Sequence, residues 1–95
     1  MYYVYILLNL DEKSARKFYL GMTTKPVNIR EDEHNRGLTT WTSKFGPWKL
    51  IYFEAYLSLE DAKRREKQLK HHGKGFQELK RRLESSINDA KKVRD

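Results

Sequence analysis

Residues 56–69 read Tyr-Leu-Ser-Leu-Glu-Asp-Ala-Lys-Arg-Arg-Glu-Lys-Gln-Leu, and we take this stretch as the organising element of the chain. Ser58 followed by Asp61 resembles a capping box, so we expect a helix that begins here and runs to about His72. Four positions spaced like one face of a helix form its inward stripe: Leu59, Ala62, position 66 and Leu69. The spacing predicts a helix that packs this stripe against the body of the protein.

Glu66 places a carboxylate in that stripe, and basic side chains surround it on the same helix. Burying an unpaired carboxylate costs free energy, so Glu66 needs an arginine, hydrogen bonds or a metal ion as its partner. Two interpretations stay open on periodicity alone. Glu66 belongs to a structural salt bridge or a partly solvated stripe, or it is a metal ligand in a cleft.

The chain has 95 residues and no cysteine. This length fits one domain, which we expect to span residues 1–87, followed by a charged tail over 88–95 that frays. Without cysteine, disulfides and thiolate metal sites are excluded, and a cytoplasmic location is expected. No apolar run approaches the roughly 20 residues of a transmembrane helix, so we expect no membrane span.

The formal net charge is +7, from 20 lysines and arginines against 13 acidic residues. The excess is concentrated in residues 60–95, which carry 12 basic and 7 acidic side chains. A basic half of this kind predicts a polyanionic partner, most commonly nucleic acid. Solubility alone and an anionic membrane surface are the alternatives. The C-terminal helix lacks the aromatic-rich apolar face of a membrane-surface anchor, which ranks the membrane last.

Two β-rich stretches open the chain, over 2–8 and 17–23. They are joined by a short polar segment, so we expect an antiparallel hairpin. Alternation gives the first strand two apolar faces, which predicts a sheet covered on both sides. Gly21 inside the second strand indicates a bulge or a close backbone approach.

The remaining elements follow in order: a helix over about 27–36 ending at Gly37, a loop over 37–47, a strand over 48–56, the helix described above, a turn at Gly73 and Gly75, and a last helix from about 76 to 83 or beyond. The order is β-β-α-β-α-α. It predicts an α+β fold in which a three-stranded antiparallel sheet is flanked by helices.

Several polar side chains fall where these elements could bring them together. Tyr5 and Tyr19 lie on hairpin faces that could coincide, and Arg30 and His34 share one helix face because they are four residues apart. Each also has an ordinary role: a strand tyrosine is usually core, a helical arginine usually lies at the surface, and a lone histidine is usually a satisfied polar residue. No single residue identifies a site.

Together these residues resemble the GIY-YIG nucleases. The resemblance rests on Tyr3-Val4-Tyr5 paired with Tyr19-Leu20-Gly21, and it continues along nearly the whole chain, from about residue 2 to 83. Its further elements are Arg30, the His34-Asn35 pair, the run Gly46-Pro47-Trp48-Lys49-Leu50 and the run Glu66-Lys67-Gln68-Leu69. Tyr replaces the first Gly, as in the small single-domain branch of the family, and Leu20 replaces the middle Ile.

The resemblance implies a metal-dependent endonuclease that hydrolyses phosphodiester bonds. Glu66 would hold one divalent ion, Mg²⁺ or Mn²⁺, which keeps several waters and therefore needs few protein ligands. Arg30 would bind the scissile phosphate through its planar fork. Tyr19 would take the proton from the attacking water, Tyr5 would orient that water, and His34 would assist the transfer.

The resemblance also implies a nucleic-acid partner, DNA more than RNA, and a role that could include DNA repair. No room remains for a separate binding domain, so we expect structure-guided or weakly sequence-specific cleavage. Side chains that could track the backbone or stack on a base are Trp41, Lys63, Arg64, Lys67, Lys70 and Lys74. The alternative is a module on the same fold that binds nucleic acid and cuts poorly or not at all.

Overall fold

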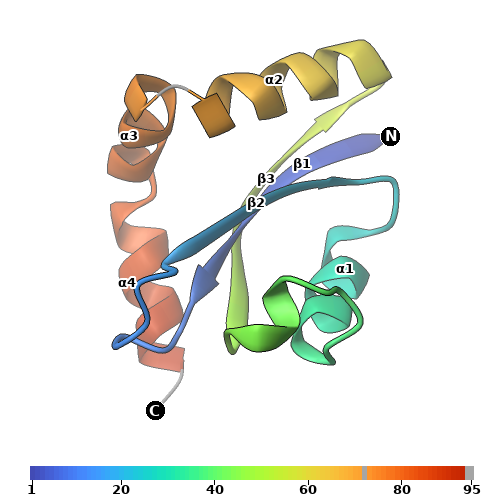
Figure 1. Ribbon diagram of the computed structural model, residues 1–95. Coiled ribbons are helices and arrows are strands. Elements are labelled where there is room, and N and C mark those ends of the chain that lie inside the picture. Colours follow the sequence, from blue (N-terminus) through green and yellow to red (C-terminus); the bar gives the residue numbers. More distant parts are fainter. Residues whose placement is uncertain (72, 94–95) are drawn as a thin grey trace.

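The computed structural model describes residues 1–71 and 73–93, in which a three-stranded antiparallel sheet separates two layers of helix (Figure 1). The strands are β1 (Tyr2–Asn9), β2 (Phe18–Thr23) and β3 (Trp48–Tyr56), in the order β2-β1-β3. The helical elements are α1 (Val27–Asn35), the short 3-10 helix η1 (Thr42–Lys44), α2 (Leu59–His71), α3 (Gly73–Arg82) and α4 (Glu84–Val93). The predicted α+β class and the antiparallel hairpin are confirmed.

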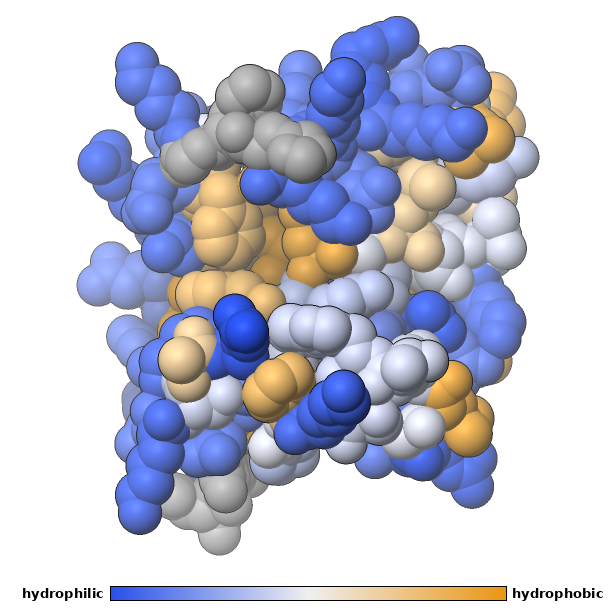
Figure 2. Space-filling view, in the orientation of Figure 1, coloured by the Kyte–Doolittle hydropathy of each residue, from blue (hydrophilic) through white to orange (hydrophobic). Residues whose placement is uncertain are grey.

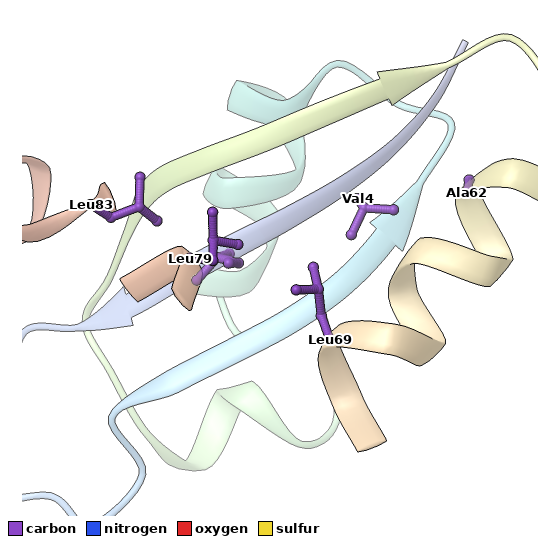
Figure 3. Close-up of a cluster of buried hydrophobic side chains, with 6 residues drawn as sticks. Val4, Ala62, Leu69, Leu79 and Leu83 are labelled. Atoms are coloured by element: carbon purple, nitrogen blue, oxygen red, sulfur yellow. The ribbon is translucent and has the colours of Figure 1, made fainter. Parts of the chain in front are cut away.

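Central strand β1 is buried on both faces, as its two apolar sets of side chains predict. Val4 and Ile6 point into one core with Ala62 and Leu69 of α2, and helices α2, α3 and α4 cover this side, which we call the α2 face (Figure 3). Tyr5 and the residues in phase with it point into a second core on the opposite side, which we call the α1 face. The candidate site residues are therefore divided between two layers.

A β-bulge in β3 lets this one strand serve both cores. Ile6 pairs with Tyr52 and Leu7 with Leu50, so one residue of β3 is skipped in the register. Residues opposite each other in an antiparallel pair share a face, so the skip transfers the even-numbered positions of β3 from one face to the other. Trp48 and Leu50 consequently pack on the α1 face, while Tyr52 packs on the α2 face. Simple alternation along the strand does not predict this change.

Helix α2 begins at Leu59, directly after the predicted capping residue Ser58. The backbone N–H of Glu60 donates to Ser58 Oγ at 3.2 Å, which satisfies one of the free amides of the first turn. Asp61 does not complete a reciprocal box, because its carboxylate accepts from Arg64 instead. Two stripe positions are confirmed as core: Ala62 is fully buried and Leu69 is 4 % exposed.

The C-terminal part differs from the sequence-based expectation. Helix α3 already begins at Gly73, so Gly73 and Gly75 lie in a helix and not in a turn. Residues 88–93, expected as a frayed tail, belong to α4. The physical reason is that Ile87 and Ala90, three positions apart, pack inward, and Ala90 is 5 % exposed. Residue 72 and residues 94–95, which the predicted helix end and tail include, lie outside the described residues.

Candidate active site

The hydroxyl of Tyr5 is the centre of a polar cluster on the α1 face. Tyr5 is 1 % exposed, and its Oη lies 2.7 Å from His34 Nε2 while Arg30 Nε donates to it at 3.3 Å. Gly21 faces Tyr5 across the β1–β2 pair, and a Cβ on Gly21 would lie 2.6 Å from Tyr5 Oη. The close backbone approach predicted for this glycine is therefore confirmed, and it makes room for the tyrosine.

Helix α1 presents Arg30 and His34 to this hydroxyl from consecutive turns. The helix follows Pro26, whose fixed φ suits a helix start, and it ends before Gly37, whose φ of +76° is the left-handed conformation that favours glycine. Residues four apart lie on one helix face, so a single hydroxyl of β1 can contact both. The predicted shared face of Arg30 and His34 is confirmed.

His34 is held from its other ring nitrogen by a shell that the sequence did not reveal. The hydroxyls of Thr42 and Thr39 lie 2.6 and 3.0 Å from His34 Nδ1, and the two hydroxyls also bond to each other. Since Arg30 donates to the Tyr5 oxygen, we assign the Tyr5 proton to His34 Nε2 and the ring proton to Nδ1. The arrangement fixes the imidazole in one orientation.

Burial sets the protonation of this pair. It lowers the pKa of His34 to about 4, with help from the positive charge of Arg30, so the imidazole is neutral at neutral pH. Burial also raises the pKa of Tyr5 to about 12, against the hydrogen bond from Arg30. Both groups therefore stay neutral near pH 7, and Tyr5 stays a proton donor to the ring.

Arg30 is anchored on two sides and open on a third. Its Nη1 donates to Glu33 at 3.0 Å, and Lys25 bonds to the same carboxylate at 2.5 Å. Burial alone would lower the pKa of Arg30, but the bonds to Glu33 and Tyr5 outweigh it and the pKa is raised. Among the described residues, no partner occupies Nη2. A fixed guanidinium with a free edge suits an incoming phosphate.

Tyr19 lies at the outer side of this cluster, on edge strand β2. Its ring centroid is 4.8 Å from that of His34 and 6.2 Å from that of Tyr5, and its side chain is only partly buried. The predicted convergence of the two motif tyrosines is confirmed. Trp41, which is 42 % exposed, stacks at a tilt on Tyr19 with a centroid distance of 5.7 Å.

The loop that carries Trp41 is clamped to the end of α1. Asn35 Oδ1 accepts from the backbone N–H of Trp48, and Asn35 Nδ2 donates to its carbonyl, both at 2.7 Å. The Trp48 indole N–H donates to the carbonyl of Thr42 at 3.1 Å. From the sequence, Asn35 was identified only as part of a motif. In the structure its side-chain amide bonds to the backbone of Trp48 as a neighbouring strand would, and these two bonds hold the loop beside the site.

Glu66 projects from α2, in the other helical layer. Its side chain is 22 % exposed and pairs with Lys70 at 3.4 Å. This is a solvated i,i+4 pair, which is worth at most about 1 kcal/mol, so a metal ion could displace the lysine. In residues 1–71 and 73–93, no cluster of three or more His, Asp or Glu side chains is arranged for a metal. One carboxylate still fits Mg²⁺, which retains waters and takes phosphate oxygens as ligands.

Two grooves along β2 connect the layers. The first is lined by Tyr19 and Trp41 from the α1 face and by Lys70 of α2. The second is lined by Arg30 of α1, by residues at the end of β2 and by Leu59 of α2. Along the sequence of α2, Glu66 lies between Leu59, which lines the second groove, and Lys70, which lines the first. Because β2 is the edge strand, the side chains of both helical layers can converge beyond it.

The predicted backbone-tracking side chains are exposed on α2 and α3. They are Lys63, Arg64, Lys67, Lys70 and Lys74. Two of them already have acidic partners, since Arg64 bonds to Asp61 and Lys70 to Glu66. Figure 2 shows hydrophilic residues along α2 above a band where hydrophobic surface is visible. This face thus combines positive charge with apolar surface.

A family model described as the GIY-YIG catalytic domain matches residues 1–80 of the chain. No match is found among curated proteins or among solved structures. None of the helices in residues 1–71 and 73–93 is long and apolar enough to cross a membrane.

Proposed function

The chain belongs to the GIY-YIG family, whose domain is of the nuclease type, and on that basis we propose that it is a divalent-metal-dependent endonuclease acting on DNA. Its cleavage is guided by the structure of the DNA and only weakly by sequence, as would suit a repair function. The observation that carries this proposal is Arg30, half-buried and held by fixed partners yet open at one edge, in a groove that reaches α2.

Arg30 binds the scissile phosphate in this scheme. Its Nε and Nη1 are committed to Tyr5 and Glu33, so the guanidinium is oriented before the substrate arrives. An oriented cation lowers the free energy of the extra charge that develops on the phosphate as water attacks. Lys25, paired with the same Glu33, adds positive charge at the same groove.

Glu66 would hold the metal ion in this scheme. A bound Mg²⁺ or Mn²⁺ supplies Lewis-acid stabilisation of the phosphate and of the leaving oxygen. The support for Glu66 is its place in the sequence of α2 between residues that line the two grooves, and its weak ion pair with Lys70. Among the described residues, no cluster of three or more His, Asp or Glu side chains offers an alternative metal site.

Tyr19, once deprotonated to its phenolate, accepts the proton of the attacking water, because it is the motif tyrosine that keeps the solvent access through which its own proton can leave. Tyr5 is too buried to touch that water, so its proposed role shifts to positioning Arg30 and His34. His34 remains neutral and orients the ring stack with Tyr19. These roles divide the chemistry between one partly buried tyrosine, Tyr19, and one fully buried tyrosine, Tyr5.

A cleavage panel tests the proposal. Labelled duplex, single-stranded, flap and branched DNAs are incubated with Mg²⁺, Mn²⁺ or EDTA, using wild type and Glu66→Ala. We expect metal-dependent nicks with wild type and at least a 100-fold loss in Glu66→Ala. Binding to these DNAs without cleavage of any of them would favour a non-catalytic binding module. Unchanged cleavage by Glu66→Ala would contradict the assignment of the metal ligand.

A further inference from the structure

The groove beside Tyr19 extends beyond the reacting groups, and no ligand has been assigned to it above. Its volume is about 360 Å³, within the range of sites for small organic groups. The described residues that line it are Phe18, Tyr19, Leu20, Trp41, Leu69, Lys70 and Phe76. They come from the edge strand, from the Trp41 loop and from α2 and α3, so four separate parts of the chain build this one hollow.

The lining is aromatic, with cations at its margin. Phe18 and Phe76 meet edge to face with centroids 5.3 Å apart, and Lys80 Nζ lies 5.6 and 5.4 Å from their two centroids. Trp41 contributes a ring that is 42 % exposed, whereas Trp48 behind it is buried and Tyr19 and Phe45 beside it are partly buried. Lys70 adds a second ammonium group, shared with Glu66. An apolar slot with a basic margin fits a flat, apolar group that carries negative charge beside it.

The position of Trp41 is fixed by the site itself. The next residue, Thr42, is 1 % exposed and bonds to His34 Nδ1 at 2.6 Å, and its carbonyl accepts from the Trp48 indole. The exposed ring is therefore held in place on a loop that is tied to the polar cluster, and little rotational freedom would be lost when a second ring stacks on it.

We propose that this groove binds one unpaired nucleobase next to the phosphate held at Arg30. The base stacks on Trp41, and Lys70 and Lys80 contact the flanking phosphates. A base paired inside a duplex cannot enter such a slot without being unstacked, so the groove selects single-stranded, flapped or distorted DNA. This inference rests on the proposed function, since it names the substrate class of the same site.

Binding to two probes of equal length isolates the contribution of the base. One is oligothymidylate, and the other is the fully abasic deoxyribose-phosphate oligomer, which keeps every phosphate. Affinities are measured in EDTA by fluorescence anisotropy, so cleavage does not contribute. We expect wild type to bind the thymidine oligomer about 5- to 100-fold more tightly, the range for stacking of one base on an aromatic ring.

Three variants make the test specific. Trp41→Ala should bind both probes with the weaker affinity, and Trp41→Phe should keep most of the preference. Leu57→Ala removes an apolar side chain that is 85 % exposed and does not line the groove, so it should match wild type. Equal binding of both probes by wild type, or a preference that survives in a folded Trp41→Ala, would overturn the proposal.

The binding assay and the cleavage panel together separate this inference from the proposed function. Tighter binding of the thymidine oligomer by a protein that cuts no substrate would support the base-binding groove and reject the nuclease proposal. Metal-dependent cleavage by a protein that binds the two probes equally would support the nuclease proposal and reject the base-binding groove.

Discussion

Tyr5 Oη and His34 Nε2 lie 2.7 Å apart inside the protein, with both side chains 1 % exposed. This bond joins the central strand to α1, and through Thr42 it reaches the loop that carries Trp41. A buried polar bond of this kind stabilises one arrangement of the surrounding groups, because leaving either partner unpaired is costly. We therefore propose that this pair positions the other groups of the site.

Tyr5→Phe should reduce both activity and stability. The substitution leaves His34 Nε2 and Arg30 Nε without their shared partner, which costs about 1–3 kcal/mol of unfolding free energy. We expect at least a tenfold loss of single-turnover cleavage. Tyr3→Phe is the matched control: Tyr3 lies on the same face of β1 and packs against Phe53, and its hydroxyl has no partner among the described residues. An equal effect of both variants would contradict the positioning role.

Stability should fall between pH 6.5 and 4.5 because of His34. Its folded pKa of about 4 lies below the ordinary 6.5, so the unfolded chain binds the proton first. The stabilisation is complete above the unfolded pKa and is lost as the pH falls toward the folded pKa, by about 2 kcal/mol over this interval. Urea titrations at several pH values measure it, and His34→Gln should flatten the slope. A slope that His34→Gln leaves unchanged would assign the loss to other groups.

Two glycine substitutions should change the free energy of unfolding in opposite directions. In Gly21→Ala the new methyl group would lie 2.6 Å from Tyr5 Oη and 2.8 Å from Tyr19 Cε2, which forces overpacking worth about 1–3 kcal/mol. In Gly75→Ala the nearest atom is 3.5 Å away and the residue is helical, so we expect stabilisation of about 0.5–1 kcal/mol. Thermal unfolding of both proteins checks this. A tolerated Gly21→Ala would show that Tyr5 can move.

Glu54→Gln should weaken the contact between β3 and α2 and destabilise the protein. Arg65 Nε lies 3.0 Å from both carboxylate oxygens of Glu54, which also accept from the hydroxyls of Tyr52 and Tyr56. Despite burial, these bonds hold the pKa of Glu54 below its usual value, so its contribution is present above the ordinary pKa and lost as the pH falls below it. We expect a loss of about 2 kcal/mol near neutral pH. A double-mutant cycle with Arg65→Gln measures the coupling, and additive losses would contradict it.

The strands and the helix beginning at Leu59 could be predicted because each has a strong local signal: alternating apolar side chains, a capping serine or a glycine at a helix end. The convergence of the site tyrosines, Tyr5 and Tyr19, could also be predicted, since the hairpin brings their strands side by side. The bulge in β3 could not be predicted from the sequence. It arises because Leu50 packs into the core on the α1 face whereas Tyr52 packs into the core on the α2 face.

The shell around His34 could not be predicted for a related reason. Thr39 and Thr42 lie in a polar loop whose sequence resembles any solvent-exposed connection, and their contact with His34 exists only once Asn35 has clamped that loop to Trp48. Residues 88–93 were misassigned because their charge outweighed the two apolar positions that pack them, Ile87 and Ala90. Long-range contacts decided each of these cases.

The most direct test of the central claim is the dependence of single-turnover cleavage on Mg²⁺ concentration in Glu66→Gln and Glu60→Gln. Both substitutions remove one negative charge from α2, but Glu60 lies exposed in its first turn. The account predicts that Glu60→Gln matches wild type, whereas Glu66→Gln cleaves at least 100-fold more slowly or needs far more metal. Identical metal dependence in the two variants would contradict the claim that Glu66 holds the ion.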